Sequence, residues 1–139
     1  MDSFDYVMEH LDPFINKYIS TGKSSLGEED RELLAIWLVD SEVNNGGFDQ
    51  FYWNSAGDLA KEAIEGFATI GAEERAEIVE AANSHFPGQR PSEDRKERQK
   101  QLDLIQSSTG SKLSSLDKEY YASKEDVIEL LAEYLKNRE

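Results

Sequence analysis

The sequence contains no cysteine, and this absence excludes several kinds of protein. Disulfide frameworks, thiolate zinc sites and cysteine nucleophiles all require thiols. The fold must therefore rest on a hydrophobic core alone. A chain of 139 residues with 38% hydrophobic residues is long enough to bury one continuous core without a disulfide or a structural metal. We expect a single compact domain over residues 1–139.

Long apolar segments and a basic leader are also missing. The longest apolar run, Leu33 to Val39, is far too short to cross a bilayer. Residues 1–12 carry four carboxylates and no lysine or arginine, the opposite of the basic start of a signal peptide. These features, with the lack of cysteine, predict a cytoplasmic protein that does not bind membranes.

The residues that usually carry catalysis are scarce. His10 and His85 are the only histidines, and neither lies in a metal-ligand or triad pattern. The glycine pair Gly46-Gly47 lacks the lysine and the preceding strand of a phosphate-binding loop. Carboxylate pairs are so numerous that any fold brings some together, which gives no support to a glycosidase-like or metal site. We predict no enzyme, no cofactor and no metal site.

Basic residues are in short supply compared with acidic ones. The chain has 29 acidic and 15 basic residues, a net charge of −14. Such a surface repels phosphate backbones and anionic lipids, so direct nucleic-acid binding is not expected. Basic proteins, such as a DNA-binding transcription regulator, become the natural partners. The simpler alternative is that the acidity only keeps the protein soluble.

The apolar residues that are present repeat at helical spacing, and no segment alternates with the period of a strand. The sequence therefore predicts an all-α domain of about six to eight helices. The first helix presents the stripe Phe4, Met8, Leu11, Ile15 and Tyr18, with Pro13 either kinking it or starting a helix. A helix from about Glu28 to Val43 is apolar all round at its centre and is expected to form the core.

Further helices are predicted along the rest of the chain. Two short helices, one ending at Gly71 and one from Ala72 to about His85, should form an antiparallel hairpin. Another covers Leu116 to Tyr121 after a loop between Ser107 and Ser115, and one more ends the chain. Serines are the expected N-caps, namely Ser55, Ser92 and Ser123.

An unusual segment, from Glu42 to Asp58, combines amides, glycines and four aromatic residues. It resembles the domain of unknown function 4375 family, and the similarity is strongest over residues 30–88. The resemblance implies an all-helical, often dimeric protein without enzymatic activity. In one characterised bacterial member it implies an acidic surface that imitates duplex DNA and occupies a transcription factor.

The segment itself has two interpretations. Its polar and glycine residues turn the chain while the aromatics anchor it against Trp37 and the core, or the amides line a shallow pocket together with Tyr52. The motif residues concerned are Asn44, Asn45, Gly46, Gly47, Phe48, Gln50 and Asn54.

Carboxylates recur at helical spacing in three rows, which we expect to face solvent. Side chains three or four residues apart on a helix lie about 5–6 Å apart, on the scale of neighbouring phosphates of DNA. Residues 49–86 contain eight acids and only two bases, Lys61 and Arg75, so we expect the two rows in this segment to be largely unneutralised. The first row is Asp2, Asp5, Glu9 and Asp12; the second is Asp58, Glu62 and Glu65; the third is Glu73, Glu77 and Glu80.

The rows predict an acidic protein-binding surface, with a DNA mimic as the leading hypothesis. An immunity-type inhibitor of a basic toxin or nuclease makes the same electrostatic demand. Residues 87–101 are expected to form an exposed mixed-charge segment, in which Arg90, Arg95, Lys96, Arg98 and Lys100 are neutralised by interleaved acids. Alternatively these cations pair with the acidic row of a second subunit, which would make the protein a homodimer.

Overall fold

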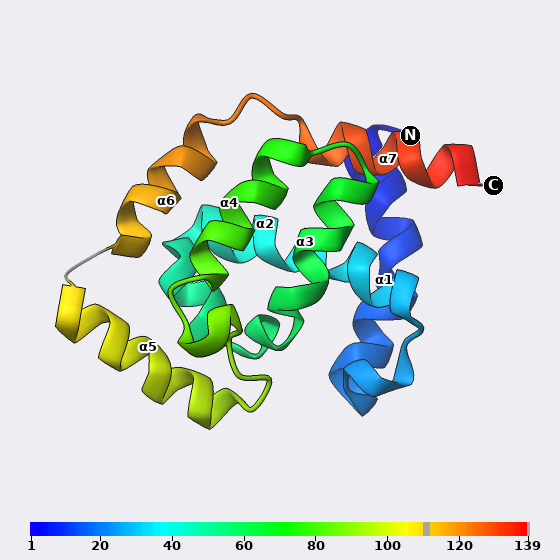
Figure 1. Ribbon diagram of the computed structural model, residues 1–139. Helices are drawn as coiled ribbons and strands as arrows, with labels where there is room; N and C mark the ends of the chain where they lie inside the picture. Colours follow the sequence, from blue (N-terminus) through cyan, green and yellow to red (C-terminus); the bar gives the residue numbers. More distant parts are fainter. Residues whose placement is uncertain (110–111, 139) are drawn as a thin grey trace.

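The computed structural model describes residues 1–109 and 112–138 and is all-helical over them, which confirms the predicted fold class (Figure 1). It contains seven α-helices and three short 3-10 turns in one domain. The α-helices are α1 (Ser3–Thr21), α2 (Glu28–Trp53), α3 (Ala60–Thr69), α4 (Glu73–Asn83), α5 (Arg95–Thr109), α6 (Lys112–Ala122) and α7 (Val127–Arg138). The 3-10 turns are η1 (Lys23–Ser25), η2 (Ser55–Leu59) and η3 (Pro87–Gln89).

Helix α2 is the centre of the fold, as its apolar run predicts. Leu33 to Ile36 are buried on successive faces of the helix, which requires neighbours on all sides. Helices α1, α3, α5 and α6 all pack against it. Figure 1 shows the α3–α4 hairpin in front of α2, with α1 and α7 on one side and α5 and α6 on the other. No helix among the described residues is both long and apolar enough to cross a membrane.

Helix α1 buries most of the predicted stripe, since Leu11 lies in the core and Ile15 and Tyr18 pack against it, but the stripe begins at Val7 and not at Phe4. Val7 and Leu11 are fully buried, whereas Phe4 at the start of the stripe is 49% exposed. The burial is set by α7, which packs along α1 from the far end of the sequence. Pro13 lies inside α1 and starts no new helix.

None of the three predicted serines is the N-cap of its helix. Ser55 opens η2, and α3 begins five residues later without a side-chain cap. At α7 the Asp126 carboxylate, not Ser123, accepts the Glu129 N–H, at 3.1 Å. Ser92 accepts the Asp94 N–H, and Asp94 in turn accepts the Glu97 N–H in the first turn of α5.

The loop predicted between Ser107 and Ser115 is helical where it is described. Helix α5 continues to Thr109, and α6 begins at Lys112. Gly110 and Ser111 lie outside the described residues.

The mixed-charge segment 87–101 is exposed over most of its length, but Arg98 is an exception. This side chain is fully buried and is not neutralised by the interleaved acids of its own segment. Its guanidinium donates to the carbonyl oxygens of Tyr52 (2.7 Å), Asn54 (2.8 Å) and Ser92 (2.8 Å) and to the Asp58 carboxylate (2.9 Å). Arg98 therefore fastens α5 to the end of α2 and to η2.

Candidate protein-binding surface

The glycine pair of the motif interrupts α2. Gly46 and Gly47 leave helical geometry, and Gly47 has φ of 77° and ψ of −179°, a region that is essentially restricted to glycine. A Cβ on Gly47 would lie 2.5 Å from the Asp117 carboxylate. That carboxylate accepts the Phe48 N–H at 2.7 Å, which joins α6 to the interrupted helix. Burial of Asp117, with the nearby Asp49 carboxylate, raises its pKa.

The amides of the motif hydrogen-bond across this break. Gln50 and Asn54 both donate to the Glu42 carboxylate, at 2.6 and 3.1 Å, and Asn45 donates to the Gln50 side-chain oxygen at 3.1 Å. These contacts support the interpretation that the amides turn and brace the chain.

Three of the four aromatic residues of the motif lie in the core, whereas Trp53 is 44% exposed. Phe48 and Tyr52 are fully buried with their rings stacked, and the Tyr52 hydroxyl donates to Asn83 at 2.6 Å. The core anchoring that the motif predicts is therefore present, and Trp37 packs edge-on against Phe4 of α1, with ring centroids 5.8 Å apart.

The first acidic row lies on the surface of α1. Asp2, Asp5, Glu9 and Asp12 are all exposed, as the spacing predicts. Asp2 is also the N-cap of the helix, since its carboxylate accepts the Asp5 N–H at 2.8 Å.

The second row does not form a free acidic surface. Asp58 pairs with the buried Arg98, and Glu62 pairs with both Lys23 and Arg31 at 3.3 Å, which leaves its side chain 12% exposed. Only Glu65 of this row is exposed. The prediction of three solvent-facing carboxylates is therefore wrong, because the neutralising cations come from segments far away in the sequence.

The third row is an exposed acidic strip along α4. Glu73, Glu77 and Glu80 all face solvent, and none of them forms an ion pair with a residue that the structure describes. The one base of this helix, Arg75, is 8% exposed and turns inward. Its guanidinium lies over the Tyr120 ring, 4.7 Å from the ring centroid, and donates a hydrogen bond to the backbone carbonyl of Glu125.

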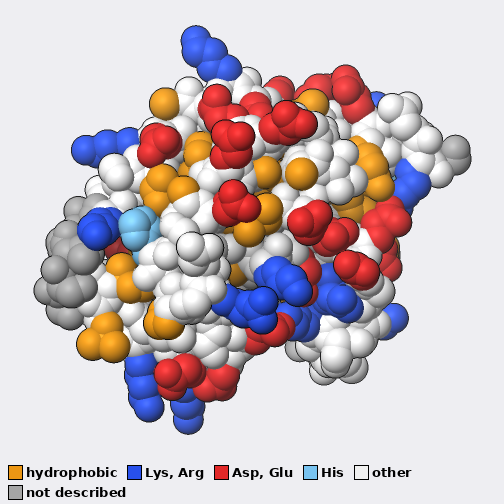
Figure 2. All heavy atoms as spheres, in the orientation of Figure 1, with side chains coloured by type: hydrophobic (Ala, Val, Ile, Leu, Met, Phe, Trp, Pro, Cys, Tyr) orange, Lys and Arg blue, Asp and Glu red, His pale blue; other side chains and the backbone are white. Residues whose placement is uncertain are grey.

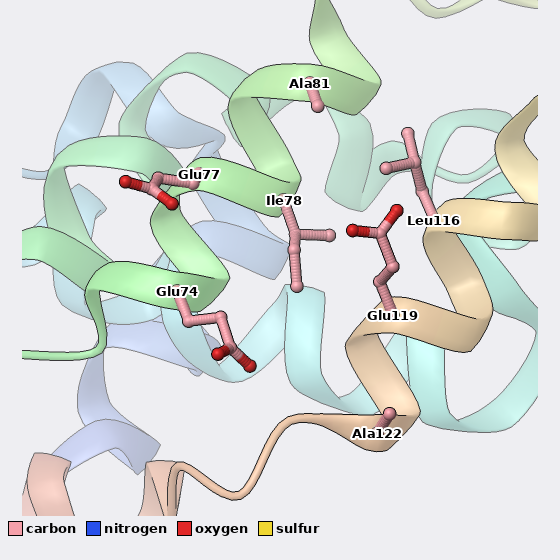
Figure 3. Close-up of a pocket in the computed structure, with 7 residues that line it drawn as sticks. All are labelled: Glu74, Glu77, Ile78, Ala81, Leu116, Glu119 and Ala122. Atoms are coloured by element: carbon pink, nitrogen blue, oxygen red, sulfur yellow. The ribbon is translucent and has the colours of Figure 1, made fainter.

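Beside this strip lies a groove between α4 and α6, with a volume of about 360 Å³. Ile78, Ala81, Leu116 and Ala122 supply its apolar surface, and three carboxylates line it as well. Figure 3 shows Glu119 projecting from α6 toward Ile78 and Glu74 reaching toward the open end near Ala122. The third carboxylate, Glu77, points away from α6 in this view. We call these seven residues the α4–α6 groove.

The groove includes two acidic residues that the rows omitted, Glu74 and Glu119. A signal for the α4 side was present in the sequence, because Glu74, Glu77, Ile78 and Ala81 are spaced i, i+3, i+4 and i+7 and so share one face. No local pattern could place Glu119 opposite them.

Acidic side chains are gathered on this face of the molecule. Figure 2 shows carboxylates interspersed with apolar atoms over the α3–α4 hairpin, while one group of lysine and arginine side chains lies below them and others are scattered around the edge of the view. Within the part of the chain that is described, no group of three or more His, Asp or Glu side chains is arranged to hold a metal ion. This face therefore presents carboxylates beside apolar side chains.

Comparison with known families supplies one match. The sequence model of a family described as DMP19-like protein matches residues 24–138, which include the interrupted α2 and the α4–α6 groove but not the row on α1. No significant match was found among curated proteins or among solved structures. Because the matched range covers most of the sequence, the chain belongs to the DMP19-like protein family.

Proposed function

We propose that this protein binds a basic, DNA-reading surface of a transcription regulator and competes there with DNA. The observation that carries the proposal is the acidic strip on α4. Glu73, Glu77 and Glu80 keep the spacing of a carboxylate row, and no described cation neutralises them. Membership of the DMP19-like family supports the same direction.

The physical basis is electrostatic complementarity. Carboxylates about 5–6 Å apart along a helix present negative charge on the scale of a phosphate backbone. The net charge of −14 steers a basic partner toward the protein from a distance, and added salt weakens this attraction. The acids stand in for phosphates and not for bases, so recognition depends on the partner's cationic surface.

The test is displacement of DNA from its regulator. A transcription regulator encoded beside this protein is bound to fluorescent operator DNA, and the protein is titrated in at low salt. We expect release of the DNA, with an effect that declines as salt rises. No displacement of any such regulator at low salt would contradict the proposal.

Charge reversal then tests the surface. A triple variant, Glu73→Lys, Glu77→Lys and Glu80→Lys, should abolish displacement while helical circular dichroism stays unchanged, because all three side chains are exposed. The matched control carries Asp5→Lys, Glu9→Lys and Asp12→Lys on α1, which changes the net charge by the same amount. If the control loses displacement equally, bulk charge and not the α4 strip is responsible.

A further inference from the structure

The α4–α6 groove combines carboxylates with apolar side chains, whereas imitation of a phosphate row requires only the carboxylates. A carboxylate row alone would imitate phosphates on a flat surface. Here Ile78, Ala81 and Leu116 form an apolar floor next to the charged groups, within a volume of about 360 Å³. The Glu119 carboxylate lies over this floor, and Glu74 stands at its open end (Figure 3).

We propose that the groove binds a single arginine side chain that a basic partner inserts between α4 and α6. The aliphatic stem of the arginine packs on Ile78 and Leu116, and its guanidinium bonds to Glu74 and Glu119. That the arginine belongs to a DNA-binding protein rests on the proposed function. The chemistry of the groove stands independently of it.

Arginine fits this groove better than other cations for two reasons. Its three-carbon stem covers apolar surface while the charged end reaches polar groups. Its planar guanidinium offers five N–H donors in a fixed fork, which can bond to two carboxylates at once, whereas a lysine ammonium is a strongly hydrated point charge.

The other acidic hollow of the molecule shows what distinguishes this groove. Between η1, α2 and α3, a second hollow is lined by Glu62 and other carboxylates, but also by Lys23, Arg31 and Lys61. Two of these cations already bond to Glu62. The described residues that line the α4–α6 groove include three carboxylates and no lysine or arginine, so these carboxylates are open to a cation from a partner.

The first experiment uses a defined probe. A helical alanine-based peptide with one central arginine is titrated against the full chain with labelled isoleucine and leucine methyl groups. We expect shifts of the Ile78 and Leu116 methyl signals. A peptide in which neutral citrulline replaces the arginine should bind at least about tenfold more weakly, because it keeps the shape and loses the charge-assisted hydrogen bonds. Equal binding of both peptides, or no shift at these methyls, would overturn the proposal.

A pair of matched variants separates local binding from bulk charge. Glu74→Gln with Glu119→Gln and the control Glu73→Gln with Glu80→Gln each remove two negative charges, but only the first pair changes the groove. We expect the groove pair to weaken peptide binding about tenfold and the control pair less than about threefold, since screened surface charges contribute little. Equal losses would refute a specific arginine site.

A third variant tests the shape of the groove separately from its charge, and the groove variants together distinguish the arginine site from the proposed function. Ala81→Leu fills the groove without changing its charge, and it should also remove peptide binding.

If the regulator is displaced from DNA equally well by the wild type and by all groove variants, the proposed function holds and the arginine site is wrong. If the peptide binds in the groove but no regulator is displaced, the arginine site holds and the proposed function fails.

Discussion

Replacement of the buried Arg98 by alanine should destabilise the fold severely. Arg98 is fully buried and holds three backbone carbonyl oxygens and the Asp58 carboxylate at 2.7–2.9 Å. An alanine at this position satisfies none of these four groups. The carboxylate would also lose its cation while it remains only 29% exposed.

The magnitude follows from the groups left without partners. Removing one member of a buried ion pair costs about 3–5 kcal/mol, because the remaining charge is uncompensated. Each orphaned buried carbonyl adds to this cost unless water reaches it. Against a typical total stability of about 5–15 kcal/mol for a protein, we expect a loss of at least about 3–5 kcal/mol in the free energy of unfolding.

Urea denaturation followed by circular dichroism at 222 nm measures this loss. The control is Lys100→Ala, an exposed position two residues further along α5, where the change should stay within about 0.5 kcal/mol. A loss below about 1 kcal/mol for Arg98→Ala would refute the view that Arg98 fastens α5 to η2. Arg98→Lys should recover only part of the stability, since an ammonium cannot reach all four acceptors in a fork.

Three further outcomes are expected from the same denaturation assay. Gly47→Ala should lower the free energy of unfolding by more than Gly22→Ala. Both glycines have φ near 80° and extended ψ, but only Gly47 has a carboxylate within contact distance of an added Cβ. Equal losses for the two variants would contradict this close approach. Glu32→Gln should raise stability at neutral pH by roughly 0.2–0.5 kcal/mol, as expected for relieving one like-charge pair on a helix. Burial and neighbouring glutamates raise the pKa of Glu32, so its ionised form destabilises the fold. The stability gained by Glu32→Gln should therefore vanish once the pH falls below the pKa of Glu32 in the unfolded chain. A gain that persists at lower pH would show that ionised Glu32 is not its cause. Glu125→Ala should lower stability by at least about 1 kcal/mol, because its carboxylate accepts two backbone N–H groups at the start of α4, and an unchanged midpoint would exclude that role.

The parts of the fold that the sequence predicted are those determined by consecutive residues. The run Leu33 to Val39 is apolar on every face, and a helix with that pattern has to be central. The α3–α4 hairpin follows from two short periodic segments separated by Gly71, whose φ of 88° suits glycine.

The N-caps show where local reasoning fails. A serine near a helix start satisfies the local pattern, but it competes with any other acceptor that the fold brings to the same N–H groups. At α7 that acceptor is Asp126, three residues after the predicted Ser123. At α4, for which no serine cap is predicted, the acceptor is Glu125, which reaches the N–H groups of Glu74 and Arg75 from about fifty residues further along the chain. The sequence around α4 contains no information about this contact.

The predicted exposure of the second acidic row is wrong because cations from distant segments pair with it, whereas the first and third rows are exposed as predicted. Helical spacing decides which carboxylates share a face, but not whether a cation from elsewhere lies against them. Asp58 is paired with Arg98, forty residues away, and is part of the structure and not of a binding surface.

The difference between the second and third rows depends on where the nearby cations point. On α3, Glu62 receives Lys23 and Arg31 from segments that fold over it. On α4, Arg75 is the only base, and it is held inward by the Tyr120 ring and by Glu125. Arg75 is also two residues from Glu73 and from Glu77, and side chains at that spacing do not share a face of a helix, so its charge stays away from the strip. The inward anchoring of this one arginine therefore preserves the negative charge that the proposed partner would meet.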